Sequence, residues 1–199
     1  MPDTGAPWNI PYVAGTDLVS DWPTDSQTLA EAIADGLDDA SLIKQVVQTV
    51  KTDTFTTTSK TFGDITGLTA SITPATATNK VLIVASLELG QTATANWGYH
   101  VRLAGGNAGN YVGTGTLGNR IASAHSFLND TAVVDNELTN VTLVYLDSPA
   151  TTSPTTYSVQ VAGGGSGTGT ITLNRSSSDF DLALAGRTAS SLTLIEVAA

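Results

Sequence analysis

From residue 41 to the end of the chain, short runs of alternating apolar and polar residues follow one another without a helical pattern between them. In the run 80–89, for example, every second residue from Val81 to Leu89 is apolar. A period of two residues is typical of a β-strand with one buried face. Clusters of Gly, Pro, Asn, Ser and Asp separate the runs and predict turns. We expect strands near 43–53, 54–62, 65–73, 80–89, 97–104, 120–128, 139–146, 156–162, 168–173 and 191–197. Short strands in this number without intervening helices predict an all-β fold, with residues 41–199 forming one antiparallel β-sandwich.

Two of the expected strands carry apolar residues on both faces. The run 80–89 adds Leu82 and Val84 to its second face, and the last strand is apolar on both sides. A sandwich buries only one face of each sheet, so a second apolar face suggests a subunit contact. The alternative is a strand covered by its own loops. The candidate contacts in the last strand are Leu192 and Leu194 on one face and Ile195 and Val197 on the other.

Residues 1–25 combine large apolar side chains with a backbone that resists regular structure. Pro7, Pro11 and Pro23 remove backbone donors and push the preceding residues into extended conformations. Aliphatic side chains nevertheless gain about 1.5–3 kcal/mol each on burial. We therefore expect this extended segment to bury its apolar residues in a groove of a larger partner. The candidate docking residues are Trp8, Ile10, Tyr12, Val13, Leu18 and Trp22.

Residues 26–40 predict one short helix. Thr28 and Glu31 have the spacing of a capping box, and an apolar residue recurs every four positions. A helix of this length is marginal alone in water, so a partner must cover its stripe. The stripe consists of Leu29, Ile33 and Leu37.

Composition excludes several classes of partner. The chain has 199 residues and a net charge of −10, with 8 basic against 18 acidic residues. Because binding to nucleic acid or to an anionic membrane needs clustered Lys and Arg, we expect neither partner. No apolar stretch is long enough to predict membrane insertion, and no basic, apolar leader predicts Sec-type export. The absence of cysteine excludes disulfides and Cys-ligated metals.

The motifs that resemble catalytic or cofactor sites fail on their context. "GTGTLG" (113–118) has dinucleotide-binding spacing, but a strand-like run follows it where a helix is required. His100 and His125 are the only histidines, and the acid pairs Asp179/Asp181 and Asp135/Glu137 provide too few oxygens for Ca²⁺. Packed histidines and solvated turn acids remain the alternatives to metal ligands. We expect no enzyme activity, no cofactor and no metal site.

Three aromatic residues lie beside loops rich in Gly and Asn. Flat aromatic faces next to polar side chains suit sugar rings, so these residues are candidate glycan contacts. Packing in the core or in an interface is the alternative. The three residues are Trp97, Tyr99 and Tyr111.

The segment from Gln45 to Gly90 resembles a β-sandwich module of tailed-bacteriophage structural proteins, especially fibres and spikes. The resemblance is carried by Gln48, "KTDTF" (51–55), "DITGL" (64–68) and "SITP" (71–74). The closing run "LTLIEVAA" (192–199) is similar to the last strand of such modules, whereas residues 91–190 match only in style. The opening residues resemble, more weakly, the attachment end of phage fibre proteins.

The resemblance implies a jelly-roll-like knob in a homotrimer, and location in the virion. Residues 1–25 would dock to other virion proteins (capsid, portal, tail or fibre base). Residues 26–40 would form a trimer stalk, and the knob of residues 41–199 would bind a host-surface glycan. The subunit contacts named above would then be trimer contacts. The alternative is a decoration or cement protein that stabilises a capsid shell.

Overall fold

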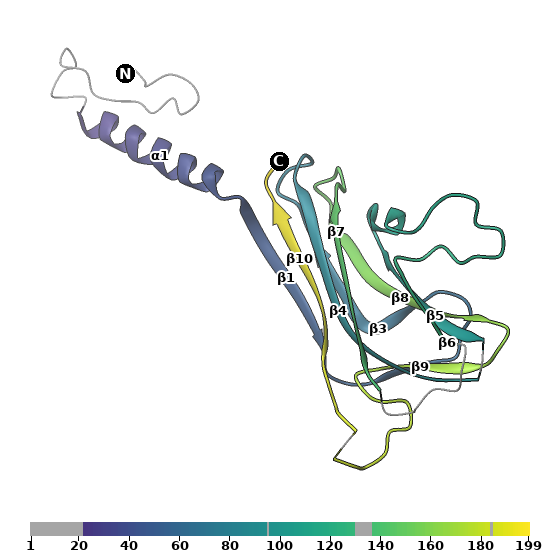
Figure 1. The fold of residues 1–199 in the computed structure, drawn as a ribbon. Helices are drawn as coiled ribbons and strands as arrows, with labels where there is room; N and C mark the ends of the chain where they lie inside the picture. Colours follow the sequence, from purple (N-terminus) through teal and green to yellow (C-terminus); the bar gives the residue numbers. More distant parts are fainter. Residues whose placement is uncertain (1–21, 95, 130–136, 184) are drawn as a thin grey trace. The chain divides into compact units, whose positions relative to one another are not determined.

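A computed structural model describes residues 22–94, 96–129, 137–183 and 185–199 (Figure 1). The chain divides into two compact units between Leu42 and Ile43, two residues after the predicted start of the knob at residue 41. Five of the candidate docking residues lie outside the described residues, so their role stays a prediction. They are Trp8, Ile10, Tyr12, Val13 and Leu18.

Helix α1 (Trp22–Ala40) is the one α-helix of the described chain. It begins four residues before the predicted helix, which removes Trp22 from the extended segment. Pro23 permits this start because the first turn of a helix needs no backbone donor. The Thr28 hydroxyl donates to the Thr24 carbonyl at 2.9 Å, as an interior helical residue does, so the predicted capping box at Thr28 was wrong. No helix of the described residues has the length and apolar character to cross a bilayer.

The second unit is an antiparallel β-sandwich, as predicted. Its strands agree in order with the predicted runs and pair in two sheets. The six-stranded sheet has the order β1-β10-β4-β9-β2, with β7 also paired to β4, and the four-stranded sheet has the order β3-β8-β5-β6. The elements are β1 (Ile43–Lys51), β2 (Phe55–Thr57), β3 (Gly63–Ile72), β4 (Lys80–Ala93), β5 (Trp97–Ala104), the 3₁₀ turn η2 (Ala108–Asn110), β6 (His125–Asn129), β7 (Thr139–Asp147), β8 (Thr155–Gly165), β9 (Gly169–Leu173) and β10 (Ser190–Val197).

Two strands are shorter than predicted because local hydrogen bonds compete with the sheet. After β2, the backbone N–H of Ser59 donates to the Thr57 hydroxyl and that of Thr61 donates to the Ser59 hydroxyl. Before β6, the N–H of Arg120 donates to the Leu117 carbonyl in a turn. Such turns end strand pairing even where the apolar alternation continues.

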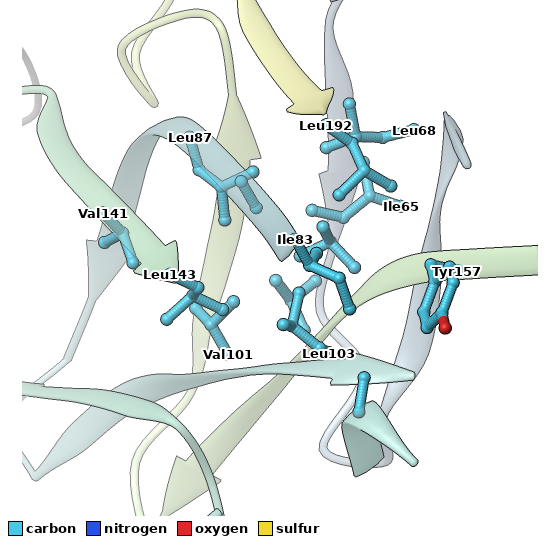
Figure 2. Packing of buried hydrophobic residues seen from close by; sticks show 14 of the residues in the cluster. Ile65, Leu68, Ile83, Leu87, Val101, Leu103, Val141, Leu143, Tyr157 and Leu192 are labelled. Carbon is cyan, nitrogen blue, oxygen red and sulfur yellow. The ribbon is translucent and has the colours of Figure 1, made fainter. Parts of the chain in front are cut away.

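The core lies between the inner faces of the two sheets (Figure 2). Alternate residues of β4 and β7, such as Ile83 and Leu143, face Val101 and Leu103 of β5 and Tyr157 of β8. All of these side chains are buried. The predicted strand periodicity therefore assigned the inner faces correctly.

Glu196 is a buried carboxylate that holds one end of the sandwich together. It accepts hydrogen bonds from the Asn79 amide at 2.6 Å, the Ala75 backbone N–H at 2.7 Å and the Gln45 amide at 2.7 Å. Burial alone raises the pKa of this carboxyl, but the three donors together with Lys44 outweigh it and the pKa is lowered. The ionised form is therefore the one that the fold requires.

We predict that this carboxylate makes the sandwich sensitive to acid. Its pKa is lower in the folded state than in the unfolded chain, so its stabilisation is fully present above the ordinary value of 4.5 and is lost as the pH falls through the folded pKa. Glu196→Gln turns an acceptor into a donor and should lower the free energy of unfolding at neutral pH by about 1–3 kcal/mol. It should also reduce the fall in the free energy of unfolding between neutral and acidic pH.

Urea unfolding of both proteins between neutral and acidic pH measures this effect. Glu31→Gln, the same change at an exposed position of α1, is the control and should leave the sandwich unchanged. Equal acid dependence of the wild type and of Glu196→Gln would contradict the prediction.

Candidate functional site

Trp97 and Tyr99, two of the three candidate glycan contacts, are core residues. Both point inward from β5, and their exposed fractions are 0% and 1%. The Tyr99 ring stacks on Phe127 with 5.5 Å between ring centroids, and burial raises the pKa of its phenol to about 12. The prediction that these two rings bind sugar was wrong, because surrounding residues bury both of them in the core.

Glycines around Trp97 explain the error. A Cβ built on Gly163 would lie 2.7 Å from Cζ2 of the indole, and one built on Gly169 would lie 2.6 Å from its Cε3. These glycines provide the space in which the indole ring is buried. The run of three glycines at 163–165 pairs with Trp97 and its neighbours in β5. A glycine run opposite a large aromatic residue is the signal that could have placed Trp97 in the core.

Tyr111, the third candidate, borders a hollow at the surface. Its ring stacks on Tyr145 of β7 with centroids 5.2 Å apart, and both rings are half-buried. The hollow has a volume of about 290 Å³ and is also lined by Val112, Gly113, Ser123 and Ala124. A pair of half-exposed rings beside backbone and hydroxyl groups is a surface on which a single sugar ring can rest. Tyr145 was not among the sequence candidates, since its strand periodicity alone placed it in a buried row.

A second hollow, of about 500 Å³, lies at the end of the sandwich near the start of β9. It is lined by Thr58, Lys60, Thr92, Ala93, Thr94, Trp97, Thr168, Gly169 and Thr170. The Lys60 ammonium donates to the carbonyls of Gly165 and Gly167 at 2.9 and 3.0 Å, which fixes the glycine-rich loop. The Thr94 hydroxyl and the Thr168 backbone bond each other reciprocally. The hydrogen bonds of these polar groups therefore hold the loops in place.

The two histidines point to opposite faces of the four-stranded sheet. His125 pairs with Val101 and His100 pairs with Ser126, so the two side chains lie on neighbouring strands one register position apart. Burial lowers the pKa of both imidazoles. Within the described residues, no group of three or more His, Cys, Asp or Glu side chains could hold a metal ion.

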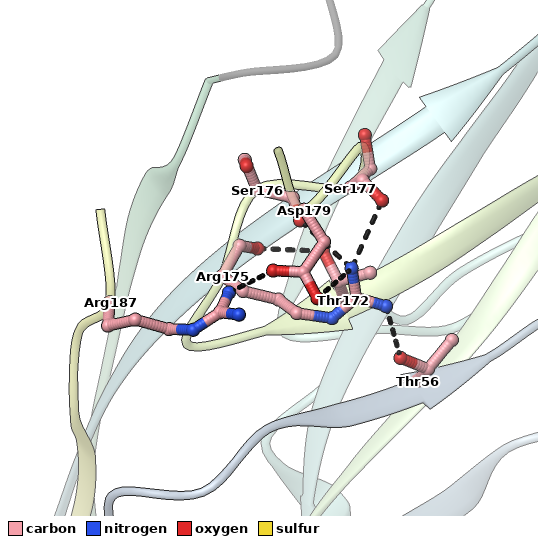
Figure 3. Close-up of polar contacts among 7 residues, drawn as sticks. All are labelled: Thr56, Thr172, Arg175, Ser176, Ser177, Asp179 and Arg187. Carbon is pink, nitrogen blue, oxygen red and sulfur yellow. Dashed lines mark hydrogen bonds and ion pairs between the residues drawn. The ribbon is translucent and has the colours of Figure 1, made fainter. Parts of the chain in front are cut away.

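The carboxylate of Asp179 forms ion pairs with two arginine side chains (Figure 3). It forms an ion pair with Arg187 and lies 3.7 Å from Arg175, and these partners hold the pKa of its carboxyl below the ordinary value. Arg175 also donates to the Thr56 hydroxyl at 3.0 Å and ties this loop to β2. The carboxylate is already neutralised, which disfavours the Ca²⁺ alternative for Asp179 and Asp181. The other pair includes Asp135, which lies outside the described residues.

The candidate subunit contacts of the last strand divide by face. Leu192 and Leu194 are fully buried in the core, so their assignment to a subunit contact was wrong. Ile195 and Val197 lie half-buried on the opposite face of β10.

In α1, Leu29 is half-buried, whereas Ile33 and Leu37 are exposed.

The outer face of the six-stranded sheet carries a row of apolar residues where β1, β10, β4 and β7 lie side by side. Val46, Val144 and Leu146 on this face are 58, 50 and 47% exposed. Val46 pairs with Ile195, Ile195 with Leu82, and Leu82 with Leu146, so one row of apolar side chains crosses all four strands. We use the term outer face for Val46, Gln48, Val50, Lys80, Leu82, Val84, Ser86, Glu88, Asn140, Thr142, Val144, Leu146, Ser191, Thr193, Ile195 and Val197.

Comparison with known proteins gives distant structural likenesses. No protein-family model matches the chain, and no curated protein matches it. A chain in a structure of infectious bursal disease virus strain Gx is 14% identical, with 78% of this chain and 36% of that one covered, at a TM-score of 0.36. A chain of the VP2 subviral particle of the same virus is 13% identical, with 77% and 41% covered, at a TM-score of 0.32. The chain thus spans less than half the length of either matched chain.

We predict that the space beside Trp97 is essential to the fold. Gly169→Ala would place a methyl group 2.5 Å from the Thr92 carbonyl oxygen and against the indole ring. Overpacking of this kind should lower the free energy of unfolding by about 1–3 kcal/mol. Gly186→Ala is the matched control, since a Cβ there meets nothing within 4 Å. Urea unfolding followed by tryptophan fluorescence measures both, and equal stabilities would contradict the prediction.

Proposed function

We propose that this chain is a non-enzymatic structural protein of a virus particle. In this proposal residues 1–25 dock to other virion proteins, and the sandwich is held at the particle by that anchor. The observation that carries the proposal is the apolar outer face, on which Val46, Val144 and Leu146 are about half exposed. A contiguous apolar patch on a well-packed domain marks a site of protein association.

The finer form of the proposal is a trimeric fibre or spike of a tailed bacteriophage, as the sequence resemblance implies. The exposed Ile33 and Leu37 of α1 support a stalk, because a short amphipathic helix needs a partner for its stripe. The alternative is a decoration or cement protein of a capsid. The burial of Trp97 and Tyr99 supports this alternative, since it leaves fewer aromatic rings for a receptor.

Host adhesion is a second candidate function, and it depends on the Tyr111–Tyr145 hollow. A volume of about 290 Å³ is at the small end of ligand pockets. It would suit one sugar unit of a surface glycan. Weak sites of this size become effective when several copies are displayed together.

We predict that an antibody against residues 43–199 labels intact, purified particles of the virus that encodes this chain. Electron microscopy with gold-labelled antibody shows whether the label lies on the capsid, at its vertices or on the tail. Label on the particle agrees with a displayed sandwich. Absence of the chain from purified particles, by mass spectrometry, would contradict the proposed function.

We predict that Tyr111→Ala abolishes binding of the assembled protein to a glycan microarray, because a sugar loses half of its aromatic platform. Phe180→Ala, which removes an exposed ring elsewhere, should keep full binding. Thermal unfolding of both variants shows whether the sandwich remains folded. If the wild-type protein binds no glycan on the array, or if Tyr111→Ala binds as the wild type does, the adhesion candidate is wrong.

A further inference from the structure

We infer that the outer face binds the outer face of a second copy of this chain, with the two sheets packed face to face about a two-fold axis that runs across the strands. This inference rests on the register and charges of the sheet. It deepens the proposed function, which rests on the same outer face, by naming a second copy of this chain as the partner at that face.

The apolar residues of the outer face form a continuous surface because the strands are in register. The row Val46–Ile195–Leu82–Leu146 crosses four strands, and Val84 pairs with Val144 in the next row. Residues directly opposite each other on antiparallel strands have Cβ atoms about 4.5–5.5 Å apart, close enough for their side chains to form one flat patch. Stacked sheets in β-sandwiches use surfaces of this kind.

The whole outer face, its polar residues included, reaches the size that a dimer requires. Four strands spaced about 4.8 Å apart, each about 26 Å long over the eight residues of β10, cover about 500 Å² on one copy. Two copies would together bury about 1,000 Å², the lower bound for a specific interface. A smaller segment of chain would leave part of the row uncovered.

Charge favours a second copy and also selects its orientation. The chain has a net charge of −10, yet the outer face carries Lys80 at one end of β4 and Glu88 at the other. The remaining charged residue near this face, Lys44 of β1, lies at the Lys80 end, whereas Lys51, Asp147 and Glu196 are buried. The Glu88 carboxylate accepts a hydrogen bond from Asn140 at 2.8 Å, which orients it at the edge of the apolar patch.

A two-fold axis across the strands makes the strands of the two copies antiparallel. Lys80 of each copy then faces Glu88 of the other, and Val84, midway between them, faces its own equivalent. An axis along the strands would instead bring Lys80 against Lys80 and Glu88 against Glu88. Like charges placed directly opposite destabilise an interface, so the antiparallel arrangement is the one that the face permits.

Sedimentation velocity of the full-length protein tests the contact. Leu146→Glu places a charge in the apolar row, and it should raise the dissociation constant at least tenfold and halve the mass of the assembly. Leu128→Glu introduces the same charge at a residue that is 67% exposed on β6 of the other sheet, and it should leave the mass unchanged. Circular dichroism melting confirms that both variants are folded.

Charge reversal tests the orientation. Lys80→Glu and Glu88→Lys should each weaken association, more strongly at low salt, and the double variant should restore the wild-type dissociation constant. The inference would be overturned by a monomeric wild-type protein or by a mass that Leu146→Glu leaves unchanged. It would also be overturned by a double variant that associates more weakly than both single variants. Because these measurements use the purified chain alone, failure here is distinguishable from absence of the chain in virus particles.

Discussion

The structure depends on β4, which pairs with other strands along both of its edges and carries apolar residues on both of its faces. It pairs with β10 and β9 along one edge and with β7 along the other. Its inner residues, such as Ile83 and Leu87, lie in the middle of the core. Its outer residues Leu82 and Val84 lie in the centre of the outer face. A register shift of one residue would exchange these two sets, so the core fixes which residues the outer face presents.

Buried polar groups hold the loops at the ends of the sandwich in place, as β4 holds the strands in its middle. Glu196 accepts hydrogen bonds from two segments far from it in sequence, Gln45 of β1 and the turn that contains Ala75 and Asn79. Asp147 accepts from the Tyr157 hydroxyl at 2.6 Å and from the Asn107 backbone N–H at 3.1 Å. Asn174 donates to the carbonyls of Lys51 and Asp53 and thereby joins the β9–β10 loop to the end of β1. A buried polar group left without partners is costly, so these bonds specify one arrangement of the loops. Apart from the Tyr157–Asp147 bond across the β7–β8 turn, they join residues far apart in sequence, which explains why no local sequence pattern revealed them.

The sequence predicted those features that depend on local period, and it failed where the deciding contact is distant. Alternation placed the strands and the inner face of β4, because the period of a strand is visible within one run of residues. The role of Leu192 and Leu194 needed knowledge of which face of β10 meets the other sheet, and periodicity leaves the two faces equivalent. The environment of Trp97 needed the pairing of β5 with a glycine run in β8, some 65 residues away. The helix start failed for a local reason, since Pro23 and Ser26 fit a first turn as well as they fit an extended segment.

The burial of Trp97 also changes how the functional hypotheses compare. A sandwich that uses its largest aromatic side chains as core, and leaves Val and Leu on an outer sheet face, has its accessible apolar area arranged for contact with protein. Sugar recognition needs rings with free faces, and of the three sequence candidates only Tyr111 offers one, in company with Tyr145. Flat rows of branched aliphatic residues bind other flat apolar surfaces well and bind sugars poorly, because they offer neither ring faces nor hydrogen bonds. Within the described residues, the exposed apolar rows of this sandwich therefore suit contact with protein better than contact with sugar.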